Sequence, residues 1–339
     1  MGVVSGKLRW KSFQVLRTRS DNKSNENAHL DLNEVYKADV LEDCRTISGR
    51  RYHNVQGVQY FLPLADESRE KWRLETLSMI WKNAHNGRRF SAPMHEKLEK
   101  GARILDVGCA AGSWLLDMAI CYPKSSFVGV DISSEFIPEN EKPKNVIYLQ
   151  YNVLDGLPFC DSSFDMVYER CLISAFNKSR LITFIEECVR VTKPGGWIES
   201  HEMEAMFRGE VGPTTKRLLL AMNDFLKIKG CDARTFSTMS EYFAANGKIE
   251  NIGVEKNSIP VGSWAGPIGA LSVEAINEGW LSLKPVMQIT LGVNDQEYNG
   301  LLGQVRIEGS KYRATYRTHR VFGQKIKNVS ESENHRVAV

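Results

Sequence analysis

Asp106, Gly108, Gly112 and Asp131 combine residue types and a spacing that could do chemistry. They lie in the stretch 102–131, where a short apolar strand leads into Asp106 and a turn of small residues follows. A helical pattern comes after the turn, and a second apolar strand then ends in Asp131. Glycines let a backbone approach a bound molecule closely, and a carboxylate about 20 residues further on can hold two ribose hydroxyls. The stretch therefore predicts a nucleoside site at the ends of two neighbouring strands.

The spacing within the turn separates two kinds of nucleoside ligand. A dinucleotide site needs G-x-G-x-x-G, so that the backbone can surround a pyrophosphate. This turn reads D-x-G-x-A-x-G, with Ala110 in place of the middle glycine, and Asp106 would repel a phosphate. S-Adenosylmethionine (SAM) carries a sulfonium and an ammonium group and no phosphate, so an acidic turn suits it. We therefore expect SAM as the cofactor, and the glycine spacing counts against a nicotinamide-dependent dehydrogenase.

Four motifs in chain order resemble those of the class I SAM-dependent methyltransferases. They are LDVGCAAG (105–112), VGVD (128–131), LPFCDSSFDMVYER (157–170) and VRVTKPGGWIE (189–199). Each is weak alone, whereas all four in order at ordinary separations are specific. Two flanking segments look like the fungal methyltransferases related to the LaeA-like regulators of secondary metabolism, YFLPLADESREKWRLE (60–75) and VGSWAGPIGAL (261–271). The resemblance covers roughly residues 50 to 325.

The resemblance implies an α/β fold. We expect a doubly wound, Rossmann-like sheet of seven strands with the last strand antiparallel, helices on both faces and an N-terminal helical cap. Residues 1–50 are expected to be a flexible polar arm, because the run is rich in Ser, Asn, Asp and Lys. Residues 51–325 would form the methyltransferase domain, and 326–339 a charged tail.

Local signals predict where several helices lie. Apolar residues at helical spacing predict the cap helix over 66–86. Ser113 is placed to cap the helix that follows the glycine turn. Asn294 with Glu297 three residues later forms a capping-box pattern, which predicts another helix start.

The expected SAM contacts lie at the carboxyl ends of the strands, where such sheets bind ligands. In the resembling family, the end of the third strand contacts adenine through an acidic or amide side chain and an apolar neighbour, a pattern that Asn152 and Val153 match. Glu169 and Arg170 end the fourth strand, and Tyr60 lies in a Y-x-L-P motif that resembles the family's. The expected cofactor-binding residues are Tyr60, Asp106, Gly108, Cys109, Ala110, Gly112, Asp131, Ile132, Asn152, Val153, Glu169 and Arg170.

Three of these residues have structural interpretations that the sequence leaves open. Tyr60 could simply pack the cap helix against the core. Arg170 could form an ion pair that orders its loop. Asp131 could cap the next helix, through Ser133 or Ser134.

The chemistry of methyl transfer limits what the sequence says about catalysis. Transfer from a sulfonium is an in-line displacement by a lone pair, so the protein mainly aligns donor and acceptor and excludes water. His201 and Glu202 follow the fifth strand and are the candidates for a general base. The sequence His201-Glu202-Met203-Glu204 has no metal-binding spacing, so no metal is expected.

Composition limits the class of protein. The chain of 339 residues has 42% hydrophobic and 25% charged residues, as ordinary globular proteins do. A formal charge of +3, with Lys and Arg scattered, does not favour nucleic acid as a partner. Seven cysteines without metal-type spacing suggest a reducing compartment. With no apolar run of membrane-span length and no signal segment, we expect a cytoplasmic protein, with the nucleus possible.

Two functions follow from these observations. The first is a SAM-dependent methyltransferase that acts on an organic acceptor, a small molecule of secondary metabolism. The alternative is a methyltransferase-like regulator that binds SAM and acts through protein partners in the nucleus, with residues 1–50 as the docking arm.

Overall fold

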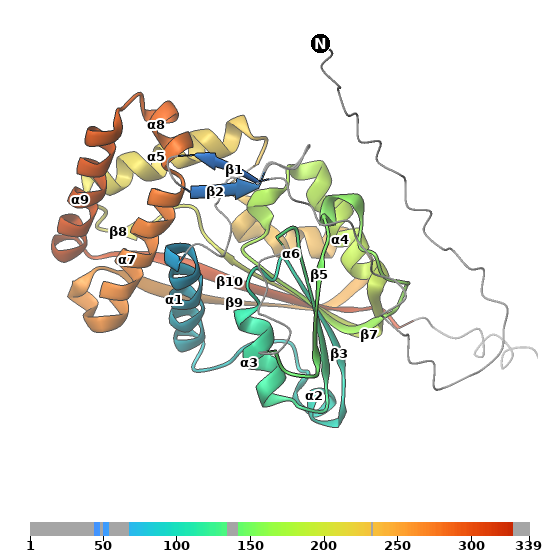
Figure 1. Cartoon of the computed structure of the whole chain (residues 1–339). Coiled ribbons are helices and arrows are strands. Elements are labelled where there is room, and N and C mark those ends of the chain that lie inside the picture. The colour runs from blue at the N-terminus through green and yellow to red at the C-terminus, as the bar shows by residue number, and fades with distance from the viewer. Residues whose placement is uncertain (1–43, 48–49, 54–67, 134–141, 232, 328–339) are drawn as a thin grey trace, which may run out of the picture. The chain divides into compact units, whose positions relative to one another are not determined.

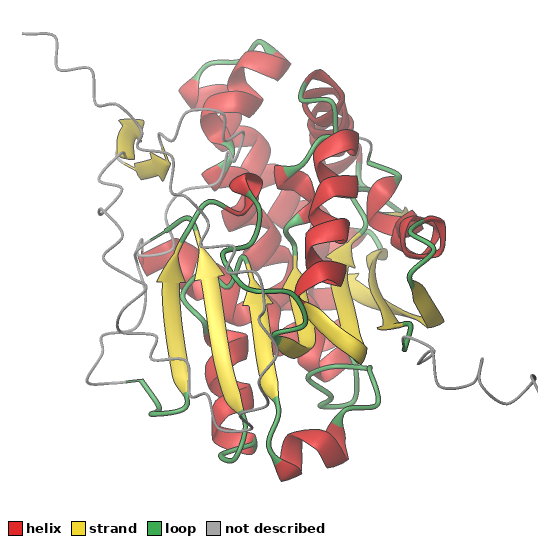
Figure 2. Ribbon diagram, turned by 90° about the vertical axis from the view of Figure 1, so that its right-hand side faces the viewer, coloured by secondary structure: helices red, strands yellow, loops and turns green. Residues whose placement is uncertain are grey.

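A mixed sheet carries the fold (Figures 1 and 2). In the computed structural model five parallel strands run in the order β5-β4-β3-β6-β7, and β10 lies antiparallel between β7 and β9. The predicted seven-stranded sheet with an antiparallel strand is therefore confirmed, and a two-residue strand, β8, also pairs with β10. The strands are β3 (Arg103–Val107), β4 (Ser126–Asp131), β5 (Val146–Gln150), β6 (Phe164–Arg170), β7 (Thr192–Met203), β8 (Arg208–Gly209), β9 (Ile249–Val261) and β10 (Ala314–Lys325).

The structure describes residues 44–47, 50–53, 68–133, 142–231 and 233–327. A short hairpin, β1 (Cys44–Ile47) and β2 (Arg50–His53), precedes the main body. Tyr60, most of the expected arm and nearly all of the expected tail lie outside the described residues.

Helices cover both faces of the sheet, as a parallel sheet requires. Neighbouring residues of a strand point to opposite faces. On one face Met166 and Trp197 pack with α2 (His95–Lys100) and α3 (Ser113–Cys121) in one apolar core. On the other face Val167 and Ile198 lie against α4 (Lys178–Val191) and α6 (Thr235–Ala245).

A second apolar core is mainly helical. It joins α1, which is the predicted cap helix, to the helices inserted between β9 and β10. Trp81, Trp280 and Tyr298 are among its largest buried side chains, and the indole nitrogen of Trp81 donates a hydrogen bond to the hydroxyl of Tyr316 on β10. The helices are α1 (Ser68–Ala84), α5 (Pro213–Ile228), α7 (Gly266–Ser282), α8 (Lys284–Leu291) and α9 (Asp295–Lys311).

Two of the predicted helix starts can be compared with the structure. The capping box at Asn294 and Glu297 is confirmed, with both reciprocal hydrogen bonds present. The cap predicted at Ser113 is wrong: Gly112 is the N-cap residue, and Ser113 is already the first helical residue.

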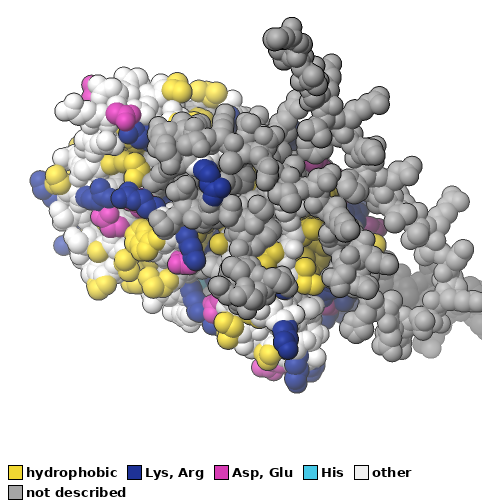
Figure 3. All heavy atoms as spheres, in the orientation of Figure 1, with side chains coloured by type: hydrophobic (Ala, Val, Ile, Leu, Met, Phe, Trp, Pro, Cys, Tyr) yellow, Lys and Arg dark blue, Asp and Glu magenta, His cyan; other side chains and the backbone are white. Residues whose placement is uncertain are grey.

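The surface and the helix lengths bear on possible partners. On the face drawn in Figure 3, Lys and Arg side chains outside the grey atoms are scattered, and several have Asp or Glu beside them. Among the described helices, none is both long enough and apolar enough to cross a bilayer.

Glu308 ties α9 to the start of α5 and yields a stability prediction. Its buried carboxylate accepts hydrogen bonds from the backbone N–H groups of Thr214 and Thr215, at 2.8 Å each. We expect Glu308→Ala to lower the free energy of unfolding by about 1–3 kcal/mol, because buried donors lose a charged acceptor. Glu308→Gln should lose less, because it keeps one acceptor oxygen. Denaturant unfolding of both variants measures the difference.

The effect should depend on pH. Burial raises the pKa of Glu308, but hydrogen bonds from Thr215 and Thr214 outweigh burial and hold that pKa below its usual value. The ionised carboxylate therefore stabilises the fold above the unfolded pKa, and this contribution is lost as the pH falls through the folded pKa. The difference between wild type and Glu308→Gln should shrink below about pH 4. A difference that is constant from pH 7 to pH 3 would contradict the assignment.

Candidate functional site

A cavity of about 530 Å³ lies at the carboxyl ends of the parallel strands. Its floor is formed by the ends of β3, β4, β6 and β7 and by the loops that follow β3, β4, β5 and β6, and its walls come from α1, α5 and α7. The volume is in the range typical of small-molecule sites. The floor carries carboxylates, whereas much of the wall is apolar. The wall includes Leu77, Trp81, Phe207, Met222, Trp280 and Leu283.

Three residues of the turn after β3 have left-handed backbone conformations. Gly108 and Gly112 have φ of 72° and 78°, values that favour glycine. Ala110 also has a positive φ, 48°, which is uncommon for a residue with a side chain. Gly108 and Ala110 line the cavity. Gly112 does not: a Cβ at this position would lie 2.1 Å from the hydroxyl of Tyr148, so packing within the protein requires this glycine.

Asp131 holds this turn in place. One carboxylate oxygen accepts a hydrogen bond from the backbone N–H of Ala110 at 2.8 Å, and the other accepts from Ser133 N–H at 2.9 Å. Ser133 is one of the two partners named in the structural alternative, but a helix that Asp131 would cap falls outside the described residues. A carboxylate has about four lone-pair positions, so both oxygens can still accept bonds from a ligand. Asp131 lines the cavity, and the structural and ligand-binding interpretations are therefore compatible.

Asp106 is a buried acid of the floor. Its side chain is 3% exposed and lines the cavity at the end of β3. Burial raises the pKa of Asp106 to about 7, the charge of Arg170 opposes this, and Asp131 and Glu169 add to it. A ligand cation beside this carboxylate would lower its pKa again.

The loop after β5 lines the part of the cavity where adenine is expected to bind. Asn152 and Val153 line the cavity together with Ile132. The Asn152 side-chain oxygen accepts a hydrogen bond from the backbone N–H of Leu154 at 3.1 Å, which fixes the amide at the start of a 3₁₀ turn, Val153–Asp155. The amide NH₂ group, a pair of donors, is the part of this side chain that suits a ring nitrogen.

Arg170 connects the floor to the cap helix. Its guanidinium donates to the hydroxyl of Ser78 on α1 at 3.0 Å and lies 5.8 Å from the ring centre of Trp81. The side chain lines the cavity. The sequence left open a structural role for Arg170, in which an ion pair orders its loop. In the structure Arg170 contacts Ser78 and Trp81 of α1.

The two predicted base candidates point to opposite faces of β7. Glu202 lines the cavity, and one of its oxygens accepts hydrogen bonds from the backbone N–H groups of Leu172 and Ile173 at 2.9 and 3.0 Å. His201 is 1% exposed and does not line the cavity. This burial away from the cavity argues against the predicted role of His201 as a base, although His201 is in register with Arg170, which lines the cavity.

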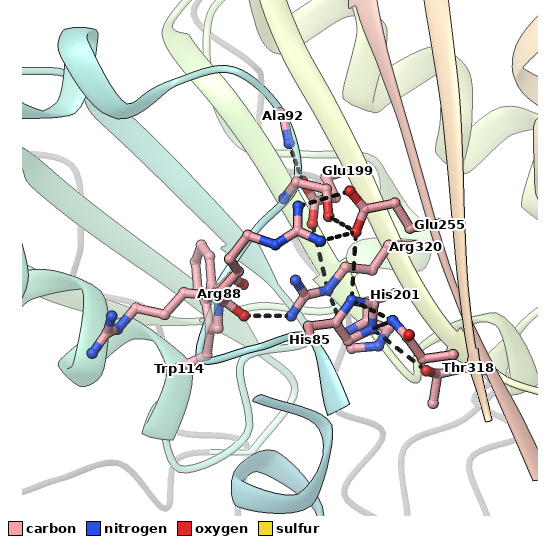
Figure 4. A network of polar contacts seen from close by, with 12 residues as sticks. His85, Arg88, Ala92, Trp114, Glu199, His201, Glu255, Thr318 and Arg320 are labelled. Carbon is pink, nitrogen blue, oxygen red and sulfur yellow. Dashed lines mark hydrogen bonds and ion pairs between the residues drawn. The ribbon is translucent and has the colours of Figure 1, made fainter. Parts of the chain in front are cut away.

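His201 belongs instead to a buried polar network (Figure 4). Its ring packs on Trp81 and His85 at centroid distances of 4.9 and 5.0 Å, and Arg320 donates to its Nδ1 at 3.4 Å. Burial, and then the charge of Arg320, hold the pKa of His201 well below its usual value. The ring is therefore neutral at physiological pH and serves packing.

The structure brings most of the predicted residues together. Glu169 does not line the main cavity and lies against α4 and α6, whereas Tyr60 is outside the described residues. The predicted residues that line the cavity are Asp106, Gly108, Cys109, Ala110, Asp131, Ile132, Asn152, Val153, Arg170 and Glu202.

Sequence reasoning missed an aromatic pair in the cavity. Trp114 of α3 and Tyr168 of β6 stack in parallel, with ring centres 3.8 Å apart, and both line the cavity. The buried hydroxyl of Tyr168 has no hydrogen-bond partner within the described ranges. The available signal was strand parity, because Tyr168 is two residues before Arg170 and so points to the same face.

Comparisons with known proteins agree with this geometry. Residues 104–196 match the methyltransferase domain family. N-methyltransferase tcpN from Claviceps purpurea is 34% identical over 150 residues, which cover 42% of this chain and 52% of that protein. N-methyltransferase verN from Clonostachys rogersoniana is 25% identical over 291 residues, covering 83% and 98%. The secondary metabolism regulator laeA from Coprinopsis cinerea is 32% identical over 162 residues, covering 46% and 38%.

Residues 104–196 are a methyltransferase domain. The motifs that carried the resemblance lie in or beside the matched region, and the fungal relatives are of the kind that the flanking segments predicted. The chain spans only about half to two thirds of the length of several fungal methyltransferases that it matches.

The cavity of the methyltransferase domain fits SAM by its chemistry. Asp106 and Asp131 offer carboxylates to an ammonium group and to ribose hydroxyls, and the turn brings backbone close to the cavity at Gly108. The unpartnered hydroxyl of Tyr168 is a further polar group available to a ligand. No group of three or more His, Cys, Asp or Glu side chains among the described residues is arranged for a metal ion.

Replacement of Asp131 should affect both the turn and SAM binding. Hydrogen bonds to charged groups contribute about 1.5–3 kcal/mol each, so Asp131→Ala should weaken SAM binding by about 10–100-fold or more. The variant should also unfold more easily, because Ala110 and Ser133 lose their acceptor. Asp131→Glu should lose less affinity, because it keeps the charge. Calorimetry and thermal unfolding on the same variants measure both effects. Normal SAM affinity in folded Asp131→Ala would refute the assignment of the ribose site.

SAM affinity should also depend on the ionisation of Asp106. A cationic ligand favours the carboxylate, and the folded pKa is about 7, so part of the population must lose a proton on binding. We expect SAM binding at pH 7 to release protons and to weaken as the pH falls from 8 to 6. Calorimetry in buffers of different ionisation enthalpy measures this release. Asp106→Asn is the matched control, and an unchanged proton release in that variant would exclude Asp106 as its source.

Proposed function

We propose that the chain transfers a methyl group from SAM to a small, largely apolar organic acceptor. One observation carries the proposal: a single cavity joins an acidic floor at the strand ends to an apolar chamber between α1, α5 and α7. The floor suits the cationic donor, and the chamber suits an acceptor with little charge. The names of the fungal relatives support methyl transfer in general.

Each part of the site has a task in this proposal. SAM, when bound, supplies an electrophilic methyl group. Asp106 would hold the ammonium group, Asp131 the ribose hydroxyls, and Asn152 the adenine. Arg170 would keep α1 over the floor and so exclude water from the reacting groups.

The acceptor class follows from the wall. Trp81, Phe207 and Trp280 present aromatic surface, and Met222 and Leu283 add aliphatic surface. Such a wall favours a molecule with an extended apolar body and few polar groups. Two relatives are named N-methyltransferases, so apolar amines stand first among the acceptors to be tried.

The boundaries and the compartment are part of the same proposal. We place the catalytic domain at 51–325, with 1–50 as an arm and 326–339 as a tail. Cys109, Cys121, Cys160, Cys171 and Cys188 form no disulfide. Reduced thiols support a cytoplasmic location, with the nucleus possible.

Ligand binding tests the cofactor. SAM and S-adenosylhomocysteine should both raise the melting temperature, since a ligand at about 100 times its dissociation constant adds roughly 2.7 kcal/mol of stability. NAD should have no effect, because the turn lacks the glycines that a pyrophosphate needs. A shift with NAD and none with SAM would end the methyltransferase proposal.

Product formation tests the activity. Labelled SAM incubated with the protein and with fungal extracts or apolar amines should give a labelled small molecule. Asp131→Ala is the matched control and should give much less. SAM binding without transfer to any small molecule would instead favour the regulatory alternative.

A further inference from the structure

Glu70 and Arg73 form an ion pair in the wall of the cavity. Both residues line the cavity, and their side chains are 2% and 10% exposed. The Nε atom of Arg73 donates to one carboxylate oxygen of Glu70 at 2.9 Å, and its Nη2 atom donates to the other at 2.5 Å. Both residues belong to α1, which packs beside α7 (Figure 1). The pair therefore places two charges in a wall that is largely apolar.

Stability alone does not account for this pair. Taking two charges out of water is costly, and apolar residues of similar volume in place of a buried ion pair often leave a protein equally or more stable. Glu204, which also lines the cavity, pairs with Arg208, but the Arg208 side chain is 50% exposed, so water solvates that pair. Glu70 and Arg73 are both buried. A ligand that uses the pair would account for its position.

Glu70 has room for one more hydrogen bond. Its Oε2 atom accepts from Nε of Arg73 and from the hydroxyl of Ser282 on α7, the latter at 3.1 Å, whereas Oε1 accepts from Nη2 of Arg73. A carboxylate has about four lone-pair positions, so Oε1 can accept a further bond. Glu70 also lies in the first turn of α1, where the helix end favours a negative charge. The side chain is therefore suited to accept a hydrogen bond from a ligand.

Gly279 leaves the pair uncovered on the α7 side. It lies within α7, has no positive φ and lines the cavity. A Cβ at this position would lie 3.7 Å from Cδ and 4.0 Å from Nη1 of Arg73, which are ordinary contact distances. Packing would therefore admit alanine, which favours a helix more than glycine does. The glycine keeps α7 from placing a side chain over Arg73.

The position of Glu70 along α1 sets a length for the ligand. Ser78 of the same helix binds Arg170 of the floor. Glu70 comes eight residues before Ser78, and a helix rises about 1.5 Å per residue, so roughly 12 Å of helix separates them. Leu74 and Leu77 line the cavity between these two levels. A ligand that lies along α1 therefore meets the floor at one end, apolar surface in the middle and Glu70 at the other end.

We propose that the methyl acceptor carries a hydroxyl or N–H group at the end remote from the methylated atom, and that the Glu70 carboxylate binds this group. The inference rests on the proposed methyl transfer and adds a feature of the acceptor. Glu70 is then a specificity-determining residue, and Arg73 balances its charge.

This contact restricts the acceptor class. The acceptor is an elongated molecule with a nucleophilic nitrogen or oxygen at one end, an apolar body, and a hydrogen-bond donor at the other end. A distal ether or ester has no hydrogen for Glu70. A distal carboxylate would meet a like charge.

Two product-like probes test the contact, 4-methoxybiphenyl and 4′-methoxybiphenyl-4-ol. They share a methylated oxygen and an apolar body, and the second adds a hydroxyl group at the far end. With S-adenosylhomocysteine present, wild-type protein should bind the hydroxylated probe about tenfold more tightly or better, as a hydrogen bond to a charged group predicts. In Glu70→Gln this preference should largely vanish, because the charge is lost and the one remaining oxygen stays with Arg73 and Ser282. Calorimetry measures both affinities.

Two control variants separate recognition from helix packing. Ser282→Ala removes a contact between α7 and α1 but leaves the Glu70 carboxylate in place, so it should keep the preference. Glu204→Gln changes another cavity-lining glutamate that pairs with an arginine, and it should also keep the preference. Loss of the preference in either control, or its persistence in Glu70→Gln, would overturn the proposal.

An apolar replacement of the whole pair covers the possibility that Glu70→Gln does not fold. The double variant Glu70→Leu with Arg73→Met should keep the melting temperature near that of wild type, because no unpaired charge remains. The Ser282 hydroxyl retains its bond to the carbonyl of Glu278. This variant should bind the two probes equally. A persistent preference for the hydroxylated probe, or a failure of both Glu70 variants to fold, would overturn the proposal.

The outcomes separate this inference from the proposed function. Calorimetry with SAM alone decides whether the cavity holds the donor. SAM binding together with equal binding of the two probes by wild-type protein would refute the role of Glu70 and leave the methyltransferase proposal standing.

Discussion

Burial of several carboxyl groups at one edge of the sheet is the constraint on which the site depends. An isolated buried charge is costly, so each group needs compensation. Asp131 obtains it from two backbone N–H groups, and Glu202 from two others. Asp106 has mainly the opposing charge of Arg170, and its pKa rises to about 7. A cationic ligand would supply the positive charge that Asp106 still lacks. The acidic floor therefore suits a sulfonium donor.

The same hydrogen bonds shape the loops that line the cavity. Asp131 binds the N–H of Ala110, a residue held at φ 48°, and so stabilises a conformation that a side chain disfavours. Glu202 binds the 3₁₀ turn that begins at Ile173, just after Cys171, whose φ is 56°. Both acids therefore order a loop and face the cavity. Asp131 and Glu202 therefore couple the geometry of the loops to ligand binding.

What the sequence predicted was local. The strand, the glycine turn, the helix and the acid of 102–131 are contiguous, and so is the capping box at Asn294, so their patterns could be recognised directly. The cap at Ser113 was a local error, whereas other differences between prediction and structure came from distant contacts. Gly112 is required by Tyr148, more than thirty residues away in the chain. His201 and Glu202 were predicted together because both follow the fifth strand, but β7 continues to Met203 through its pairing with β10, and alternation then separates the two side chains. The sequence could not predict the chamber wall from a local pattern, because α1 and α7 are far apart in the chain.

The division of the site between sheet and helices separates two tasks. The acids that would hold the donor come from strand ends and adjoining loops, whereas the chamber wall comes from α1, α5 and α7. Polar contacts clamp the wall helices together, since Ser282 of α7 donates to Glu70 of α1, and Glu70 also binds Arg73. Trp81 links the two parts, because its ring lies beside Arg170 of the floor and its indole nitrogen donates to Tyr316. The wall side chains Met222, which belongs to α5, and Leu283, the residue after α7, lie outside both this link and the clamp, so they are the positions at which the wall can change with least effect on the acidic floor.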